Sequence, residues 1–151
     1  MTKRIYKMFK RALLALVLAL AFCIANAATG GFSATAVQIA PSASKTATYT
    51  SADQTNSNWG GVIVFINTSA FVSGTFTPSI QAKDPVSGNY YTILTGAAIS
   101  GTGLVTLKVH PSITAVVNAS VADVLPLTWR VVMTGATTPS ATFSIGAVLI
   151  P

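Results

Sequence analysis

Glutamate is absent from this chain of 151 residues, and cysteine and histidine occur once each. The acidic side chains are Asp53, Asp84 and Asp123, and charged residues make up 8% of the sequence. Zinc, iron–sulfur and haem centres need clusters of His, Cys or carboxylate ligands, which this composition excludes. Three isolated aspartates also make a weak case for calcium. The sequence therefore predicts no metal site and no cofactor.

Groups able to transfer protons are equally scarce. Only His110 is available to serve as an imidazole base, and no G-x-S-x-G elbow accompanies it. A glycosidase pair would have to come from three aspartates, and no glycine-rich phosphate loop opens a helix. We expect His110 to be a solvated residue at a strand end and Asp84, which precedes Pro85, to cap a turn. The sequence predicts no catalytic residue and no enzyme.

The basic charge is confined to one end of the chain. The formal net charge is +6, but five of the nine cations lie among the first eleven residues. After residue 27, four cations face three aspartates, a balance of +1. This distribution gives no support to a nucleic-acid partner.

The first 27 residues have the three parts of a secretory signal peptide. A cationic start is followed by a 13-residue apolar run, ALLALVLALAFCI at 12–24, and then by Ala25-Asn26-Ala27. The run is shorter than the roughly 20 residues of a membrane-spanning helix. We therefore predict an apolar leader helix, cleaved after Ala27, with a retained membrane anchor as the alternative. The rest of the chain has no cysteine and must fold without disulfides.

The remainder of the sequence is typical of one all-β domain. Residues 28–44 are small and weakly apolar, which predicts a flexible lead-in with one strand at 35–39 at most. Residues 45–151 alternate β-rich runs with Gly, Pro and Asn clusters. Strands are expected at 46–51, 61–67, 75–83, 90–94, 103–109, 128–134 and 141–150. Residues 112–124 fit either a short helix or an irregular crossover. The spacing favours a single β-sandwich of immunoglobulin-like or jelly-roll-like type.

One hairpin and a core can be placed within this domain. Asp84-Pro85-Val86-Ser87-Gly88-Asn89 is a strong turn signal between the strands at 75–83 and 90–94. Side-chain alternation in the β-rich runs predicts the residues that face inward. The expected core includes Val62, Val64, Ile66, Ile80, Ile93, Leu107, Trp129, Val131, Phe143 and Ile145.

Three aromatic residues are candidates for surface recognition. Trp59 lies in the polar stretch Asn56–Gly61, and Tyr90 and Tyr91 follow the hairpin turn. An exposed ring at any of these positions could stack on a sugar or a partner protein. The structural alternative is that Trp59 folds back onto the rim of the domain and that one tyrosine faces the core. Arg130 is expected to be solvated or paired with an aspartate.

Four segments together resemble small virion-associated proteins of tailed bacteriophages and prophages. They are IQAKDPVSGNYYTIL at 80–94, LKVHP at 107–111, LPLTWRV at 125–131 and SIGAVLIP at 144–151. The likeness spans roughly residues 45–151 and carries no catalytic motif. It implies a structural role on the particle, as a head decoration or head–tail accessory protein.

Two functions follow as hypotheses. The first is a non-enzymatic structural module that assembles with itself or with other virion proteins, located in the virion. The second is an exported carbohydrate- or surface-binding module, periplasmic or extracellular after leader cleavage, that uses Trp59, Tyr90 and Tyr91. The leader favours export, because phage structural proteins normally assemble in the cytoplasm. Contact with a membrane is expected only through an uncleaved leader.

Overall fold

The computed structural model describes residues 34–151, which contain strands and no helix. The predicted leader and the first residues of the lead-in lie outside the described residues. No helix within 34–151 is long and apolar enough to cross a membrane. The strands are β1 (Thr35–Lys45), β2 (Tyr49–Thr50), β3 (Gln54–Thr55), β4 (Gly61–Lys83), β5 (Tyr90–Thr95), β6 (Gly103–Val109), β7 (Ser120–Val121) and β8 (Thr128–Ile150).

All eight strands belong to one mixed sheet. The main path runs β1-β8-β4-β6-β7, while β5 pairs with β4, and β2 and β3 pair with β8. Every pairing is antiparallel except that of β6 with β7. Residues 34–151 are therefore all-β, as the sequence predicts for the domain.

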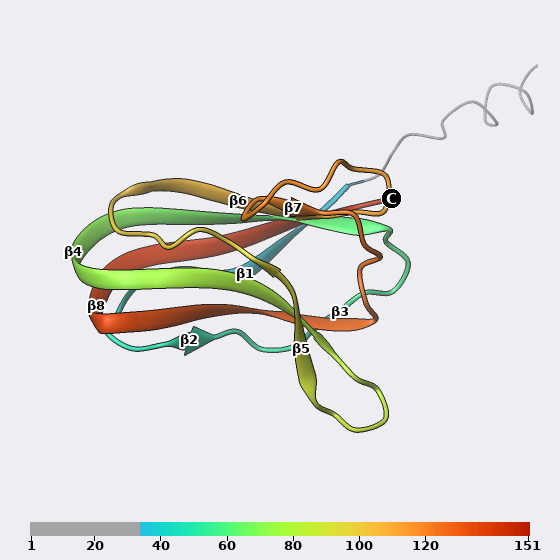
Figure 1. Cartoon of the computed structure of the whole chain (residues 1–151), viewed down its shortest axis with the longest axis horizontal. Helices are drawn as coiled ribbons and strands as arrows, with labels where there is room; N and C mark the ends of the chain where they lie inside the picture. The colour runs from blue at the N-terminus through green and yellow to red at the C-terminus, as the bar shows by residue number, and fades with distance from the viewer. Residues whose placement is uncertain (1–33) are drawn as a thin grey trace, which may run out of the picture. The chain divides into compact units, whose positions relative to one another are not determined.

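β4 and β8 form the frame of the sheet, because each is 23 residues long and they pair along most of their length. Their register runs from Gly61 opposite Ile150 to Ala82 opposite Trp129. Irregularities in the ladder fall between residues 68 and 75 of β4, where both strands bend and return (Figure 1). Such bulges bend strands and increase their twist. Gly74, in the bend, has a φ of 72°.

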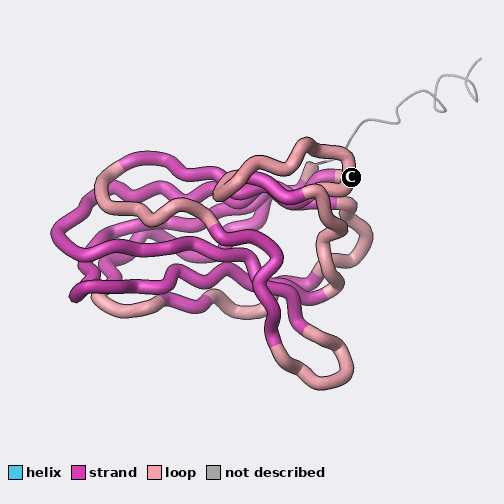
Figure 2. The backbone as a smooth tube through the Cα atoms, in the orientation of Figure 1, coloured by secondary structure: helices cyan, strands magenta, loops and turns pink. Residues whose placement is uncertain are grey.

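The bend places the two halves of the sheet face to face, with the core between them (Figures 1 and 2). Phe76, beyond the bend in β4, meets Phe143 of β8 edge to face, with ring centroids 5.3 Å apart. Tyr49 of β2 also approaches Phe143, at 6.1 Å. The two layers that the predicted β-sandwich requires are thus halves of one continuous sheet.

The predicted core is confirmed at nine of its ten positions. Val62, Val64, Ile66, Ile80, Leu107, Trp129, Val131, Phe143 and Ile145 are buried, whereas Ile93 is half-buried. Ile93 falls at a register shift of the β4–β5 ladder, where Leu94 lies opposite Ile80 and Thr92 opposite Gln81, so Ile93 has no residue directly opposite it in β4. Burial of a side chain of Leu or Phe size contributes about 1.5–3 kcal/mol.

Two segments differ from their expected form. β1 covers 35–45 and pairs with the second half of β8, so the sheet extends into the predicted lead-in. Residues 112–124 form a crossover with turns and the short β7, which was one of the two predicted alternatives. β7 lies parallel to the end of β6, with Lys108 opposite Ser120.

Candidate interaction surface

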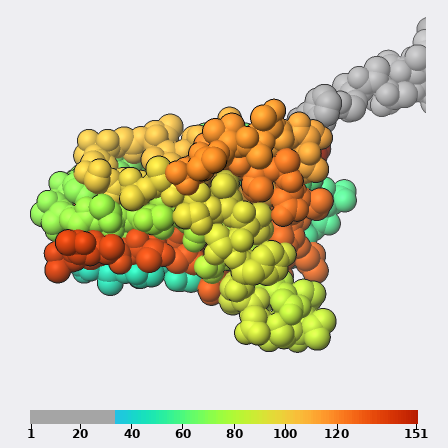
Figure 3. Space-filling model, viewed as in Figure 1, coloured from blue at the N-terminus to red at the C-terminus, as the bar shows by residue number. Residues whose placement is uncertain are grey.

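The β4–β5 turn projects from the body of the domain (Figure 3) and is closed by the side chain of Asp84. Its Oδ1 accepts the Val86 N–H at 2.9 Å, and its Oδ2 accepts the Ser87 hydroxyl. The bond from Ser87, and then that from Val86, holds the pKa of Asp84 below its ordinary value. Gly88 adopts a φ of 72°, which glycine does without steric cost. Asp84 thus makes the predicted side-chain turn.

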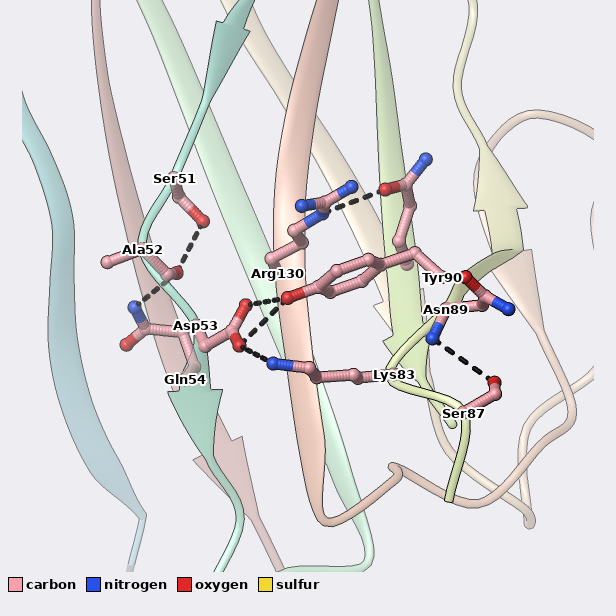
Figure 4. A network of polar contacts seen from close by, with 10 residues as sticks. Ser51, Ala52, Asp53, Gln54, Lys83, Ser87, Asn89, Tyr90 and Arg130 are labelled. Atoms are coloured by element: carbon pink, nitrogen blue, oxygen red, sulfur yellow. Dashed lines mark hydrogen bonds and ion pairs between the residues drawn. The ribbon is translucent and has the colours of Figure 1, made fainter. Parts of the chain in front are cut away.

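Directly after the turn, Tyr90 lies opposite Lys83 and reaches across to Asp53. Its phenol donates to the Asp53 carboxylate, with Oη 2.6 Å from Oδ1 and 2.8 Å from Oδ2 (Figure 4). The Lys83 ammonium lies 3.0 Å from Oδ2 of the same carboxylate. Asp53 stands between β2 and β3, so these contacts fasten that segment to the hairpin.

Arg130 of β8 covers one face of the Tyr90 ring. Its Cζ lies 3.3 Å from the ring centroid, and its Nε donates to Oε1 of Gln81 at 2.9 Å. A planar guanidinium stacked on an aromatic ring gains cation–π attraction. Because Arg130 covers the ring and Asp53 accepts from its hydroxyl, Tyr90 contributes to the scaffold of this surface.

The electrostatics of the network favour its ion pair. The bond from Tyr90, followed by that from Lys83, lowers the pKa of Asp53, while the bond to Asp53 raises the pKa of Lys83. The Lys83 and Asp53 side chains are 37% and 35% exposed, so water and salt screen their attraction. Their contacts fix geometry more than they add stability.

Tyr91 points to the other side of β5 and is 56% exposed. It lines an open groove of about 310 Å³ together with Pro85, Pro126 and Leu127, and Lys83 and Asp84 lie at its polar side. Leu127 is 65% exposed. An apolar depression with an aromatic wall and a few polar groups is the usual form of a small recognition site.

Trp59 lies in the loop between β3 and β4, half-buried and packed against the core. Buried Asn56 holds this loop, since its Oδ1 accepts the Trp59 N–H at 2.8 Å. The Asn56 amide donates to the carbonyls of Trp59 and Leu125, at 2.9 and 2.8 Å. The Trp59 ring therefore folds back onto the domain, as the structural alternative to an exposed recognition residue predicts.

The three candidate aromatic residues do not form one platform. In the part of the chain that the structure describes, no hydrogen bond or ring contact joins Trp59 to Tyr90 or Tyr91. Tyr90 and Tyr91 are neighbours along β5 but point to opposite sides, as strand alternation requires. Tyr91 is the candidate with the most accessible ring.

Sequence reasoning missed Asp53, Lys83 and Leu127 as parts of this surface. It also expected Arg130 to be solvated or paired with an aspartate, whereas Arg130 stacks on Tyr90 and bonds to Gln81. The signal for that contact is the register of β4 and β8, which sets Gln81 directly opposite Arg130. This register depends on residues 49 positions apart in the chain, so local patterns do not reveal it.

The acid–base groups of the domain have structural partners. His110 Nδ1 accepts the Ser112 N–H at 3.1 Å, so Nε2 is the nitrogen that donates to the Pro151 carbonyl, at 2.9 Å. Asp123 Oδ1 accepts the N–H of Val124 at 2.7 Å. Among residues 34–151, no three His, Cys, Asp or Glu side chains gather as metal ligands would.

These observations define residues 34–151 as an all-β domain built on one bent, mixed sheet, with a groove beside the β4–β5 turn. The sequence matches no protein-family model and no curated protein. Among solved structures, the chain is similar to the SPBc2 prophage-derived protein YomS, with a TM-score of 0.50 and 10% sequence identity. The match covers 79% of this chain and 94% of YomS. At this identity the similarity is one of fold.

Proposed function

We propose that this protein is a non-enzymatic structural module of a phage or prophage particle, of the head decoration or head–tail accessory type. The observation that carries the proposal is the fold shared with a prophage-derived protein over most of both chains. The sequence motifs around the β4–β5 turn and in LPLTWRV support the same origin.

The surface chemistry is consistent with assembly. Beyond residue 27 the charge balance is +1, and exposed apolar side chains occur on several loops and strands. They are Val72, Val86, Tyr91, Leu104, Val116, Val117, Val124 and Leu127. Low charge and exposed apolar groups favour packing against another protein over binding a charged ligand.

The test is mass spectrometry of purified particles from the strain that encodes the chain. We expect its peptides in the particle fraction, at a stoichiometry that survives repeated density-gradient purification. Neighbouring genes for a major capsid protein, portal or tail components are expected. Recovery from the periplasm or medium alone, beside genes for secretion or polysaccharide synthesis, would reject the proposal.

The non-enzymatic part has its own test. Because His110, Asp53, Asp84 and Asp123 already bond to structural partners, we expect His110→Ala and the three Asp→Asn variants to retain the assigned function within about threefold. A turnover that disappears with one of these changes would identify a catalytic residue.

A second function, recognition of a carbohydrate by an exported module, is favoured by the groove beside Tyr91. In this case Tyr91→Ala should abolish binding to surface polysaccharide in a pull-down assay. Val117→Ala is the matched control, since Val117 is exposed and does not line the groove. Equal binding by wild type and Tyr91→Ala would reject this function.

A further inference from the structure

We propose that two copies of this chain join through β1, edge to edge and antiparallel, so that their sheets become continuous across a two-fold axis. The inference rests on the proposed structural function and deepens it, because it names a second copy as partner and β1 as the contact.

β1 is the terminal strand of the main sheet path and pairs with β8 alone. In an antiparallel ladder, every second residue directs its N–H and C=O away from the neighbouring strand. Among residues 34–151, no backbone hydrogen bond outside the ladder to β8 reaches residues 35–45. One side of an 11-residue strand therefore offers donors and acceptors to an added strand.

The other edges of the sheet are shorter or partly covered. β5 has six residues, and β6 has seven, of which Lys108 and Val109 pair with β7. β2 and β3 have two residues each. Among the described strands, β1 thus presents the longest edge for pairing.

The first half of β1 also lacks the features that keep sheet edges apart. Proteins protect their edges with charged residues, proline and bulges. Pro41 and Lys45 lie in the second half of β1, and the register shifts fall between Gln38 and Ala43. Thr35–Gln38 contains neither charge nor proline and pairs with β8 in regular register. This regular stretch is where an added strand fits best.

The lack of charge points to an identical strand as the partner. Antiparallel pairing of two copies sets the same surface against itself, so a charged edge would repel its own copy. Thr35–Ser44 carries no charged residue. An open depression of about 420 Å³ beside this edge, with Phe65, Gly146 and Val148 in its wall, is likewise lined by uncharged residues. In such an isologous contact the β1 edge of each copy pairs with that of the other, so no β1 edge is left to bind a third copy and assembly stops at the dimer.

The test is the mass of the purified protein, as processed by its host, measured by sedimentation velocity and light scattering. We expect a dimer for the wild type and a monomer for Ala36→Lys/Gln38→Lys, because both positions are exposed and would carry like charges across the axis. Thr92→Lys/Thr95→Lys places the same charges at exposed positions of β5 and should remain dimeric. Far-UV circular dichroism spectra should be the same for all three proteins, which shows that each remains folded, whereas the melting temperature should depend on protein concentration only for the two dimeric proteins.

A crosslinking series tests the geometry. In a Cys23→Ser background, single cysteines are placed at each position from 35 to 40. Across a two-fold axis only residues near the axis lie opposite their own copies, so disulfide-linked dimers should peak at one or two positions.

A monomeric wild type, a dimer that persists in Ala36→Lys/Gln38→Lys, or equal dissociation of the β5 control would overturn the inference. A β1 dimer that is absent from particles would reject the proposed function and keep the inference. Protein that is found in particles but is monomeric when purified would reject the inference and keep the proposed function.

Discussion

Trp129 is only 1% exposed, and its buried indole nitrogen has no hydrogen-bond partner among the described residues. An unpartnered buried N–H costs about 1–3 kcal/mol. Trp129 is nevertheless among the largest fully buried side chains, so its packing outweighs that cost.

Replacement of Trp129 separates these two contributions. Trp129→Ala should lower the free energy of unfolding by about 3–5 kcal/mol, as for other large core residues. Trp129→Phe should cost clearly less, because it keeps a ring and removes the unpartnered N–H. Urea denaturation measures both values. Equal losses in the two variants would show that a phenyl ring recovers none of the packing of Trp129, and would contradict this account.

The bond between Tyr90 and Asp53 predicts a pH dependence. The pKa of Asp53 is below its ordinary value of 3.8, so the contact adds stability above pH 3.8 that is lost as pH falls through the lower, folded-state pKa. Tyr90→Phe should therefore lower the melting temperature at pH 7 and have a diminishing effect below pH 3.8. Tyr91→Phe is the control, with little effect at either pH. A Tyr90→Phe effect that is unchanged in acid would contradict this role for Asp53.

At the scale of strands, the bend in β4 and β8 depends on a small number of backbone positions. Gly74 and Gly88 both have a φ of 72°, but their surroundings differ. A Cβ at Gly74 would lie 2.6 Å from the Ala136 carbonyl oxygen and from the Pro139 Cα, whereas one at Gly88 would meet nothing within 4 Å.

This contrast makes a matched pair of variants. Gly88→Ala should cost about 1–2 kcal/mol, the strain of a left-handed backbone for an L-residue. Gly74→Ala should lower the free energy of unfolding by more than Gly88→Ala does, because the backbone of Ala136 and Pro139 must also move to make room for the Cβ atom. Chemical denaturation of both variants measures the difference. Equal losses of unfolding free energy in the two variants would mean that the backbone at the bend accommodates a Cβ atom without added strain.

Sequence patterns located most strands but not their continuity. Segments 61–67 and 75–83 were expected as two strands, as were 128–134 and 141–150, yet each pair is one strand through the bend. Residues such as Ser73 and Gly74 weaken local strand signals. Pairing with residues more than 60 positions away continues the ladder on both sides of Gly74, with Ser73 opposite Ser140 and Thr75 opposite Ala136.

At the scale of the whole chain, cleavage of the leader distinguishes an exported protein from one that assembles in the cytoplasm. The cationic start, the apolar run and Ala25-Asn26-Ala27 predict that the mature product begins at Ala28. Mass spectrometry of the protein recovered from particles, periplasm or medium identifies its first residue. Intact peptides from residues 1–27 in the mature product would reject cleavage and strengthen the virion assignment.

The sequence by itself determined the class of this protein, because alternation along a strand is local. It identified the all-β class, the hairpin turn at Asp84 and nine buried core positions, among them Val64 and Phe143. It also showed how few groups are available for catalysis. Only the tertiary structure decided how the strands are joined, because register and bending arise from pairings such as Gly61 with Ile150. The same long-range pairings set Arg130 on Tyr90, leave Tyr91 in its groove and make β1 an edge.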